Sequence, residues 1–409
     1  MSGVIKKLAN APDIYFIPFP TKTDEVYIDV YFRGGMYDEP KKDAGLTHTL
    51  EHYLWTMFGE KVNYSIETNA QVSGEASRFY IETTQHKAIA HMQAFFNSLF
   101  TPDFTNQDVF NRERLTIINE LNTAFNDTED RLHYIFRRTL FGEESPVARS
   151  FEEEVRNIKK FSLQTCARKH EELLSSGNIV IFIGAYLPSQ KFLNEIVNLV
   201  KGYHFSVSPE TNHKKLAVPK RLVKHATLAG RRGTYVYLVY PGYTLDDVPE
   251  KRIAQSIFSQ TFTHISNSEV FKKLRERGIY SISYRNNMCR RFGLTMFFTH
   301  LETGKETEFV SIVRKGLKKI QKDGLNPERL KERIKQARQD IERRWKDNDK
   351  RYGDIIDDIL NGHSAFTLND SKKCLEKIDN NHMKKIAKEF FNEKNMNTLT
   401  IGARKPKLK

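Results

Sequence analysis

Residues 44–52 of the chain read Ala44-Gly45-Leu46-Thr47-His48-Thr49-Leu50-Glu51-His52. Apolar residues follow at spacings of three and four, which predicts a helix from about Gly45 to Phe58. Side chains four positions apart lie on one face of a helix, so His48 and His52 can reach a single metal ion. Glu51 is adjacent and can touch a water on that ion without being a ligand. The stretch therefore predicts a metal site with its own catalytic base.

Zinc is the metal that this pattern indicates. Bound zinc lowers the pKa of its water toward about 7, and a carboxylate can then accept the proton while an amide is attacked. A catalytic zinc usually has three protein ligands. The third is expected from Glu113 or Glu120, which are seven residues apart on a helix predicted over Asn106–Phe125 and project from the same side. Spacing alone does not choose between them, and both could equally be solvent-facing charges.

The composition is that of a globular protein. The chain has 409 residues, enough for two domains of roughly 200 residues each, with 39% hydrophobic and 28% charged residues. No apolar run approaches the roughly 20 residues that cross a bilayer. The first residues lack the apolar core of a signal peptide, so the expected compartment is the cytoplasm. The three cysteines are scattered and odd in number, which excludes a thiolate zinc cluster.

The formal net charge of +14 can attract nucleic acid, an anionic membrane or acidic peptides. Most of it is expected to lie on solvated helix faces, because the basic residues of Pro327–Asp347 alternate with acidic ones at helical spacing. Neither a nucleic-acid-binding signature nor a basic strand with clustered aromatics is present. We therefore expect no nucleic-acid partner.

The order of predicted elements is repeated in the two halves. In the first half an alternating strand at Glu25–Phe32 precedes the His48 helix, and a further strand region follows at Thr68–Thr83. The second half has a strand at Thr234–Tyr240, helices at Glu250–Thr263 and Glu269–Arg277, and a strand at Ile279–Tyr284. A polar, proline-containing stretch separates the halves. We predict a catalytic domain over residues 1–205, a linker over 206–222 and a similar second domain over 223–409.

Several motifs together resemble the pitrilysin/insulinase peptidases, which include the mitochondrial processing peptidases and carry an inverted His-X-X-Glu-His zinc motif. They are Arg33–Pro40 with Ala44–His52, then Asn69-Ala70-Gln71-Val72-Ser73 with Val72 in place of the usual Thr, and Asn111–Arg114 followed by Glu120. Tyr240-Pro241-Gly242 and Ser268–Glu276 extend the resemblance into the second half.

The resemblance implies roles for individual residues. Glu120 is the third zinc ligand and Glu113 a neighbouring glutamate that orients the site. Asn69 and Ala70 belong to an edge strand that binds the substrate. Two residues of the second domain, an Arg and a Tyr, grip the substrate backbone. Arg275 matches the Arg, and the Tyr is Tyr280 or, as an alternative, Tyr284.

The resemblance also implies a fold and an activity. The fold is α+β, with two homologous ααβ-roll domains that form half of a clamshell, mostly antiparallel sheets and helices packed on one face. The activity is zinc-dependent endopeptidase cleavage of short or unfolded peptides. The positive net charge adds acidic peptides or leader sequences as expected substrates. The chain would work as a homodimer or as a heterodimer with a related subunit. The alternative is a catalytically silent subunit that binds peptides for an active partner.

Overall fold

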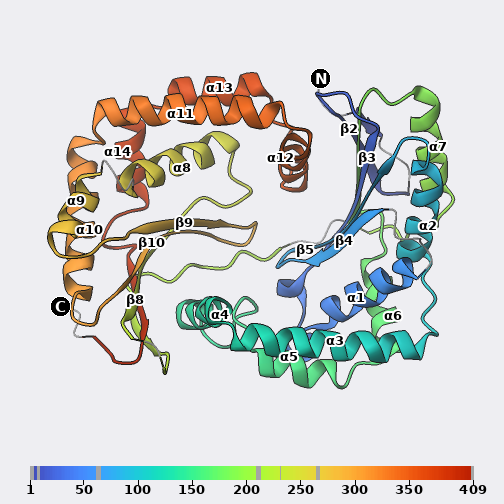
Figure 1. The fold of residues 1–409 in the computed structure, drawn as a ribbon, viewed down its shortest axis with the longest axis horizontal. Helices are drawn as coiled ribbons and strands as arrows, with labels where there is room; N and C mark the ends of the chain where they lie inside the picture. Colours follow the sequence, from blue (N-terminus) through green and yellow to red (C-terminus); the bar gives the residue numbers. More distant parts are fainter. Residues whose placement is uncertain are drawn as a thin grey trace. The chain divides into compact units, whose positions relative to one another are not determined.

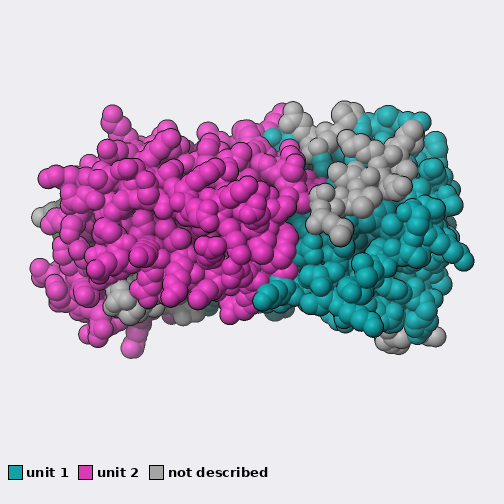
Figure 2. Space-filling model, turned by 90° about the horizontal axis from the view of Figure 1, so that it is seen from above, with its two compact units in different colours: residues 1–134, 144–213, 346–356 teal, residues 135–143, 214–345, 357–409 magenta. Residues whose placement is uncertain are grey.

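The structure is a computed structural model that describes residues 4–6, 10–60, 66–208, 213–230, 232–263 and 268–406. The described chain divides into two compact units (Figure 2). Unit 1 comprises residues 1–134, 144–213 and 346–356, and unit 2 comprises residues 135–143, 214–345 and 357–409. Each unit combines one mixed sheet with helices, which confirms the predicted α+β fold class with two similar halves. Residues 209–212 of the predicted linker lie outside the described residues.

Unit 1 contains a six-stranded sheet among its described residues, in the order β1-β2-β6-β3-β5-β4. Only β2 and β6 pair in parallel, and the other neighbours are antiparallel. The strand β4 pairs with β5 alone and is therefore an edge strand, with one row of main-chain groups outside the sheet. The strands are β1 (Val4–Lys6), β2 (Asp13–Pro18), β3 (Glu25–Arg33), β4 (Glu67–Val72), β5 (Ala76–Thr84) and β6 (Ile179–Ala185).

One face of this sheet is apolar and is covered by helices (Figure 1). Strand β5 shows the reason, because Phe79 and Ile81 point into the core while the alternate residues Arg78 and Glu82 point to the other face. Helix α1 contributes Leu50 and other apolar residues to the same core. The helices of unit 1 are α1 (Leu46–Gly59), α2 (Ala88–Phe100), α3 (Gln107–Asn126), α5 (Phe151–Ile158), α6 (Leu163–Leu173) and α7 (Gln190–Lys201), with short 3-10 turns at Met36–Asp38 and Lys41–Asp43. Helix α4 (Thr128–Phe141) begins in unit 1, and its residues from 135 onward belong to unit 2.

The opposite face of the unit 1 sheet receives a segment from late in the chain. Helix α12 (Asn348–Leu360) begins in unit 1, and its Tyr352 hydroxyl donates to the Phe182 carbonyl oxygen at 3.1 Å. The Tyr352 ring also contacts the edge of Tyr27 in β3. One helical segment from late in the chain therefore lies on the face that the other helices leave open. No local sequence pattern predicts that this segment belongs to unit 1.

Unit 2 contains a five-stranded sheet among its described residues, in the order β7-β11-β8-β10-β9. Its strands are β7 (Val223–Thr227), β8 (Thr234–Pro241), β9 (Ser283–Met288), β10 (Gly293–Leu301) and β11 (Asn397–Gly402). Its helices are α8 (Pro249–Thr263), α9 (Glu269–Glu276), α10 (Glu306–Asp323), α11 (Pro327–Trp345), α13 (Leu368–Lys377) and α14 (Asn380–Glu389). No helix in the described ranges is both long and apolar enough to cross a membrane.

The strand predicted over Ile279–Tyr284 begins later than expected, at Ser283. After α9 the chain turns through Gly278 at φ 67°, and the Ile279 N–H donates to the Leu274 carbonyl oxygen at 2.9 Å. Ile279 and Ile282 are both buried, while Tyr280 between them is exposed. The first four residues of the predicted strand therefore form an irregular segment, in which the two isoleucines are buried and Tyr280 and Ser281 are exposed.

Candidate metal centre

The residues of the predicted metal site come from two helices of unit 1 that pack against each other. Helix α1 carries His48, Glu51 and His52, and helix α3 carries Glu113 and Glu120. The long α3 starts at Asn106, whose side chain accepts the Val109 N–H at 3.0 Å and caps the helix. Ile117 and other buried residues hold α3 against the core, so its two glutamates face α1.

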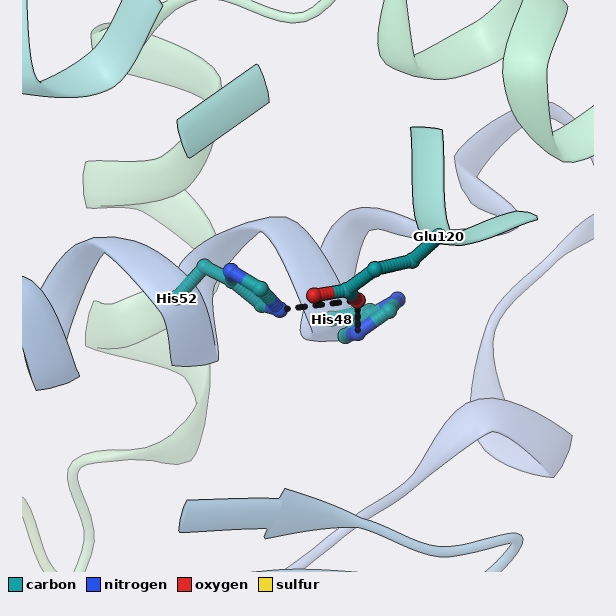
Figure 3. Close-up of side chains that lie close together, drawn as sticks. All are labelled: His48, His52 and Glu120. Carbon is teal, nitrogen blue, oxygen red and sulfur yellow. Dashed lines mark ion pairs between the residues drawn. The ribbon is translucent and has the colours of Figure 1, made fainter. Parts of the chain in front are cut away.

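The side chains of His48, His52 and Glu120 converge (Figure 3). One nitrogen from each histidine and one oxygen of Glu120 all lie within 4.8 Å of one another. The Glu120 Oε2 atom is 3.7 Å from His48 Nε2 and 3.4 Å from His52 Nε2. Within the described part of the chain, this is the one such group of three or more His, Cys, Asp or Glu side chains.

The donor set fits zinc. Zinc bonds to imidazole nitrogen and carboxylate oxygen are about 2.0–2.2 Å long, so the ligand atoms of a tetrahedral site are about 3.3–3.6 Å apart. The two measured distances to Glu120 are close to this spacing. Two imidazoles and one carboxylate also leave a fourth position open, as catalytic zinc sites do.

The ionisation of His48 suits a ligand. Burial, with a smaller contribution from the neighbouring His52, lowers the pKa of His48 to about 4. Its imidazole is therefore neutral at pH 7 and has a lone pair for a cation. Glu120 is half-exposed, which leaves the position between the three side chains accessible from solvent.

Glu51 faces the same space but stands slightly farther away. Its Oε2 atom is 4.0 Å from His48 Nε2 and 3.9 Å from His52 Nε2, and the residue is only 6% exposed. Burial raises the pKa of the Glu51 carboxyl to about 7, although the nearby His52 acts in the opposite direction. A carboxyl with this pKa can both accept and release a proton near neutrality. A bound cation would lower its pKa.

The other nitrogen of His52 meets the second glutamate of α3. His52 Nδ1 is 3.4 Å from Glu113 Oε2, while Glu113 Oε1 accepts from Arg112 Nε at 3.2 Å. The same Arg112 side chain also donates to Glu60 at 3.1 Å. No local sequence pattern indicates this bridging position of Arg112, because its partner Glu60 lies 52 residues away at the end of α1.

The predicted substrate strand is the edge strand β4. Asn69 and Ala70 lie in its middle, opposite Tyr80 and Phe79 of β5, and β4 also lies beside α1. The Ala70 N–H donates to the Asn69 side-chain oxygen at 2.8 Å. The edge strand is therefore next to the helix that carries the histidines, and one of its main-chain donors bonds to a neighbouring side chain.

The residues predicted to grip the substrate lie in unit 2. Arg275 is exposed near the end of α9, and Tyr280 is 73% exposed in the irregular segment before β9. The alternative, Tyr284 of β9, pairs with Phe297 of β10 and is partly buried against the unit 2 core. Of the two tyrosines, Tyr280 has the more accessible ring.

Comparison with known proteins agrees with this architecture. Residues 160–337 match the family model of the Peptidase M16 inactive domain. The structure is similar to a protease from Helicobacter pylori, with a TM-score of 0.82 and 16% identity over 98% of this chain and 100% of that one. A Peptidase M16 inactive domain from Pseudomonas fluorescens gives a TM-score of 0.81 and 13% identity over the whole of both chains. The chain has the fold of M16-like peptidases.

A third structure with this fold is a chain of complex III2 from Candida albicans, with a TM-score of 0.80 and 12% identity over 98% of this chain and 96% of that one. The M16-like fold thus occurs in a multi-chain complex as well as in proteases. The residues that match the family model do not include the two histidines, Glu51 or Glu120, which all precede position 160. A search of curated proteins found no match.

Proposed function

We propose that this chain is a zinc-dependent metalloendopeptidase that cleaves short or unfolded peptides. The observation that carries the proposal is the arrangement of His48, His52 and Glu120 around one position, with the buried Glu51 carboxyl about 4 Å from both histidine nitrogens. An M16-like fold supports it.

Each residue has a distinct role in this proposal. His48, His52 and Glu120 would hold the ion, and Glu113 would hold the His52 ring through its second nitrogen. When bound, zinc would polarise the scissile carbonyl group and make a water more acidic. Glu51 accepts a proton from the attacking water and returns it to the leaving amine, which its position beside the metal site and its pKa both allow.

The substrate would bind as an additional strand on the free edge of β4. Main-chain hydrogen bonds then hold any extended peptide, and alternate side chains give selectivity. The Ala70 N–H would exchange its bond with Asn69 for one to a substrate carbonyl. A peptide must be unfolded to bind in this way, which favours short or disordered substrates over folded domains.

The local charge at this edge points to the kind of side chain that the substrate carries. Glu67 of β4 lies directly opposite Glu82 of β5, so both carboxylates lie on one face of the sheet beside the free edge. Burial, followed by the proximity of Glu67, raises the pKa of Glu82 to about 7. A lysine or arginine on the bound strand would relieve this repulsion. Although the net charge of +14 suggests acidic peptides, we expect a basic residue at this position.

The second domain and a second subunit complete the proposal. Arg275 and Tyr280 are both exposed, and this accessibility supports their predicted role in gripping the substrate backbone. The chain would form the closed chamber either with another copy of itself or with a related subunit, because the chain carries both the zinc motif and the predicted gripping residues.

The test replaces Glu51 by Gln and measures zinc content and the cleavage of a quenched peptide library in the same samples. The Glu51→Gln chain should retain zinc and lose cleavage, because the ligands remain and only the proton acceptor is removed. Glu129→Gln, at an exposed position early in α4, is the matched control and should behave like the wild type. Cleavage by Glu51→Gln at the wild-type rate would refute the role of Glu51 as the base.

A second candidate function is a catalytically silent subunit that binds peptides for an active partner. The family model that matches residues 160–337 is described as an inactive domain, which favours this candidate. It predicts a purified chain with little zinc and no cleavage unless another subunit is added. Near-stoichiometric zinc in the wild-type chain, together with cleavage that needs no partner, would exclude it.

A further inference from the structure

The helix that carries the histidines begins without a capping side chain of its own. Helix α1 starts after Gly45, which has a left-handed φ of 91° and no side chain to accept the first free N–H groups. Glu39 supplies the missing acceptor from upstream in the sequence. Its Oε2 atom accepts the Gly45 N–H at 3.0 Å, and its Oε1 atom accepts the Thr47 N–H at 2.5 Å.

Glu39 is itself held in place from a distant part of unit 1. Arg149 Nη1 donates to Glu39 Oε2 at 2.8 Å, and another nitrogen of the same guanidinium group donates to the Glu39 main-chain oxygen. The Glu39 side chain is 1% exposed and that of Arg149 is 8% exposed. Burial of such a pair is costly unless nearly every polar atom is satisfied. Here Glu39 Oε2 accepts two hydrogen bonds and Oε1 accepts one.

The two histidines differ in how their rings are held. His52 is held through Nδ1 by Glu113. For His48, no hydrogen bond to Nδ1 is formed among the described residues, and its ring lies against that of His52 and near Glu51 and Glu120. The position of His48 therefore depends on the main chain of the first turn of α1, where it directly follows Thr47. That turn is the part of the helix bound to Glu39.

We propose that Glu39 is a positioning residue of the metal centre, which sets the affinity for zinc by fixing the first turn of α1 and with it His48. This inference rests on the proposed function only in so far as the site binds a metal. Glu39 touches neither the ion nor the substrate and acts through the helix. Arg149 acts in turn by holding Glu39.

A purely structural role must be distinguished from a positioning role, since the loss of any buried ion pair destabilises a protein. Unit 1 contains a matched control in the pair formed by Asp29 and Arg78. Asp29 is 1% exposed, as buried as Glu39, but lies on β3 and forms no bond to α1. Asp29→Asn and Glu39→Gln therefore remove the same charge from equally buried carboxylates, although Arg78 is more exposed than Arg149 (34% against 8%).

The experiment measures zinc affinity by competition with a chromophoric chelator in the full-length chain, together with the absorption spectrum of Co²⁺ bound in place of zinc. For Glu39→Gln we expect zinc binding about 10–100-fold weaker than in the wild type, as for other residues that orient metal ligands, and an altered Co²⁺ spectrum. For Asp29→Asn we expect a lower unfolding temperature with wild-type zinc affinity and an unchanged spectrum.

Equal zinc affinities of Glu39→Gln and the wild type would overturn the inference and leave the proposed peptidase function standing. A wild-type chain that binds no zinc would overturn both. If Glu39→Gln does not fold, Arg149→Lys decides the question, because lysine keeps a cation beside Glu39 but cannot bond to its carboxylate and main-chain oxygen in the same forked geometry. Weaker zinc binding by Arg149→Lys supports the inference, and unchanged binding contradicts it.

Discussion

The Nδ1 atom of His52 lies 3.4 Å from Glu113 Oε2, while Nε2, the other nitrogen of the same ring, lies 3.4 Å from Glu120 Oε2. This contact favours the tautomer in which Nδ1 carries the hydrogen and Nε2 has a free lone pair for a metal. The glutamates of α3 thus have different positions around the same ring. Sequence spacing alone left the two roles open, and the assignment of Glu120 as the ligand and Glu113 as the orienting glutamate came from the resemblance.

Glu113→Gln should weaken zinc binding by about tenfold, because the amide is a poorer acceptor for the His52 Nδ1–H than a carboxylate. The measurement is chelator competition at pH 7. Glu129→Gln, on the exposed face of α4, should leave the affinity unchanged. A Glu113→Gln chain that loses zinc entirely would instead indicate that Glu113 is a direct ligand.

Ala70→Pro should lower kcat/KM for an extended peptide by up to about tenfold, since one main-chain hydrogen bond contributes roughly 0.5–1.5 kcal/mol. Proline removes the Ala70 N–H, which Asn69 satisfies in the free chain, and an edge strand can accommodate proline. Zinc content should not change. Ala70→Ser retains the N–H and serves as the control. Equal peptide kinetics for the two variants would argue against strand addition at β4.

Glu67→Gln should reduce the preference for peptides with a lysine or arginine at one position of the bound strand. The expected effect is on the order of 1 kcal/mol, or about fivefold in kcat/KM, because the pair with a substrate cation is partly exposed. The measurement compares matched peptides that carry Lys or Gln at each position in turn. Glu129→Gln is the control, since Glu129 is exposed on α4, outside this sheet. A preference that Glu67→Gln leaves intact would rule out this contact.

The free energy of unfolding should depend on pH through the buried carboxyl group of Glu154. Burial, followed by the proximity of Glu39, raises its pKa from 4.5 to about 7 in the folded chain. The folded state therefore binds this proton more tightly than the unfolded state. The resulting stabilisation is full below about pH 4.5 and is lost as the pH rises through about 7.

Glu154→Gln removes this titration and should be more stable than the wild type at pH 8, by on the order of 1 kcal/mol. The advantage should shrink toward pH 5. Urea unfolding at the two pH values measures it, with the exposed Glu152→Gln as control. A difference between Glu154→Gln and wild type that is the same at both pH values would show that Glu154 does not titrate in this range.

Local patterns predicted the helices that carry the candidate metal ligands. The apolar spacing after Gly45 and the period of seven between Glu113 and Glu120 are properties of single helices, and α1 and α3 form almost as expected. The strand at Glu25–Phe32 was predicted to within one residue because it alternates and then reaches two glycines. Such elements are determined by interactions between residues close in sequence, so their pattern can be recognised in a single sequence.

Features that depend on distant contacts were not predicted. Strand β11 lies between β7 and β8 although more than 150 residues separate it from both, and no motif marked it. The first residues of helix α12 belong to unit 1, although the flanking segments of the chain belong to unit 2. Glu39 lay within a quoted motif, but its function depends on Arg149, 110 residues away, and on main-chain N–H groups that every residue possesses.

The most direct test of zinc-dependent catalysis is the mapping of cleavage sites in a defined peptide mixture by the purified chain alone. The mixture is digested with zinc present, after chelation, and after zinc is added back. The proposal predicts internal cuts by the zinc-loaded chain, their loss on chelation and their return at the same bonds when zinc is restored. Cleavage that persists without metal, or a chain that binds zinc fully and cuts no peptide, would contradict it.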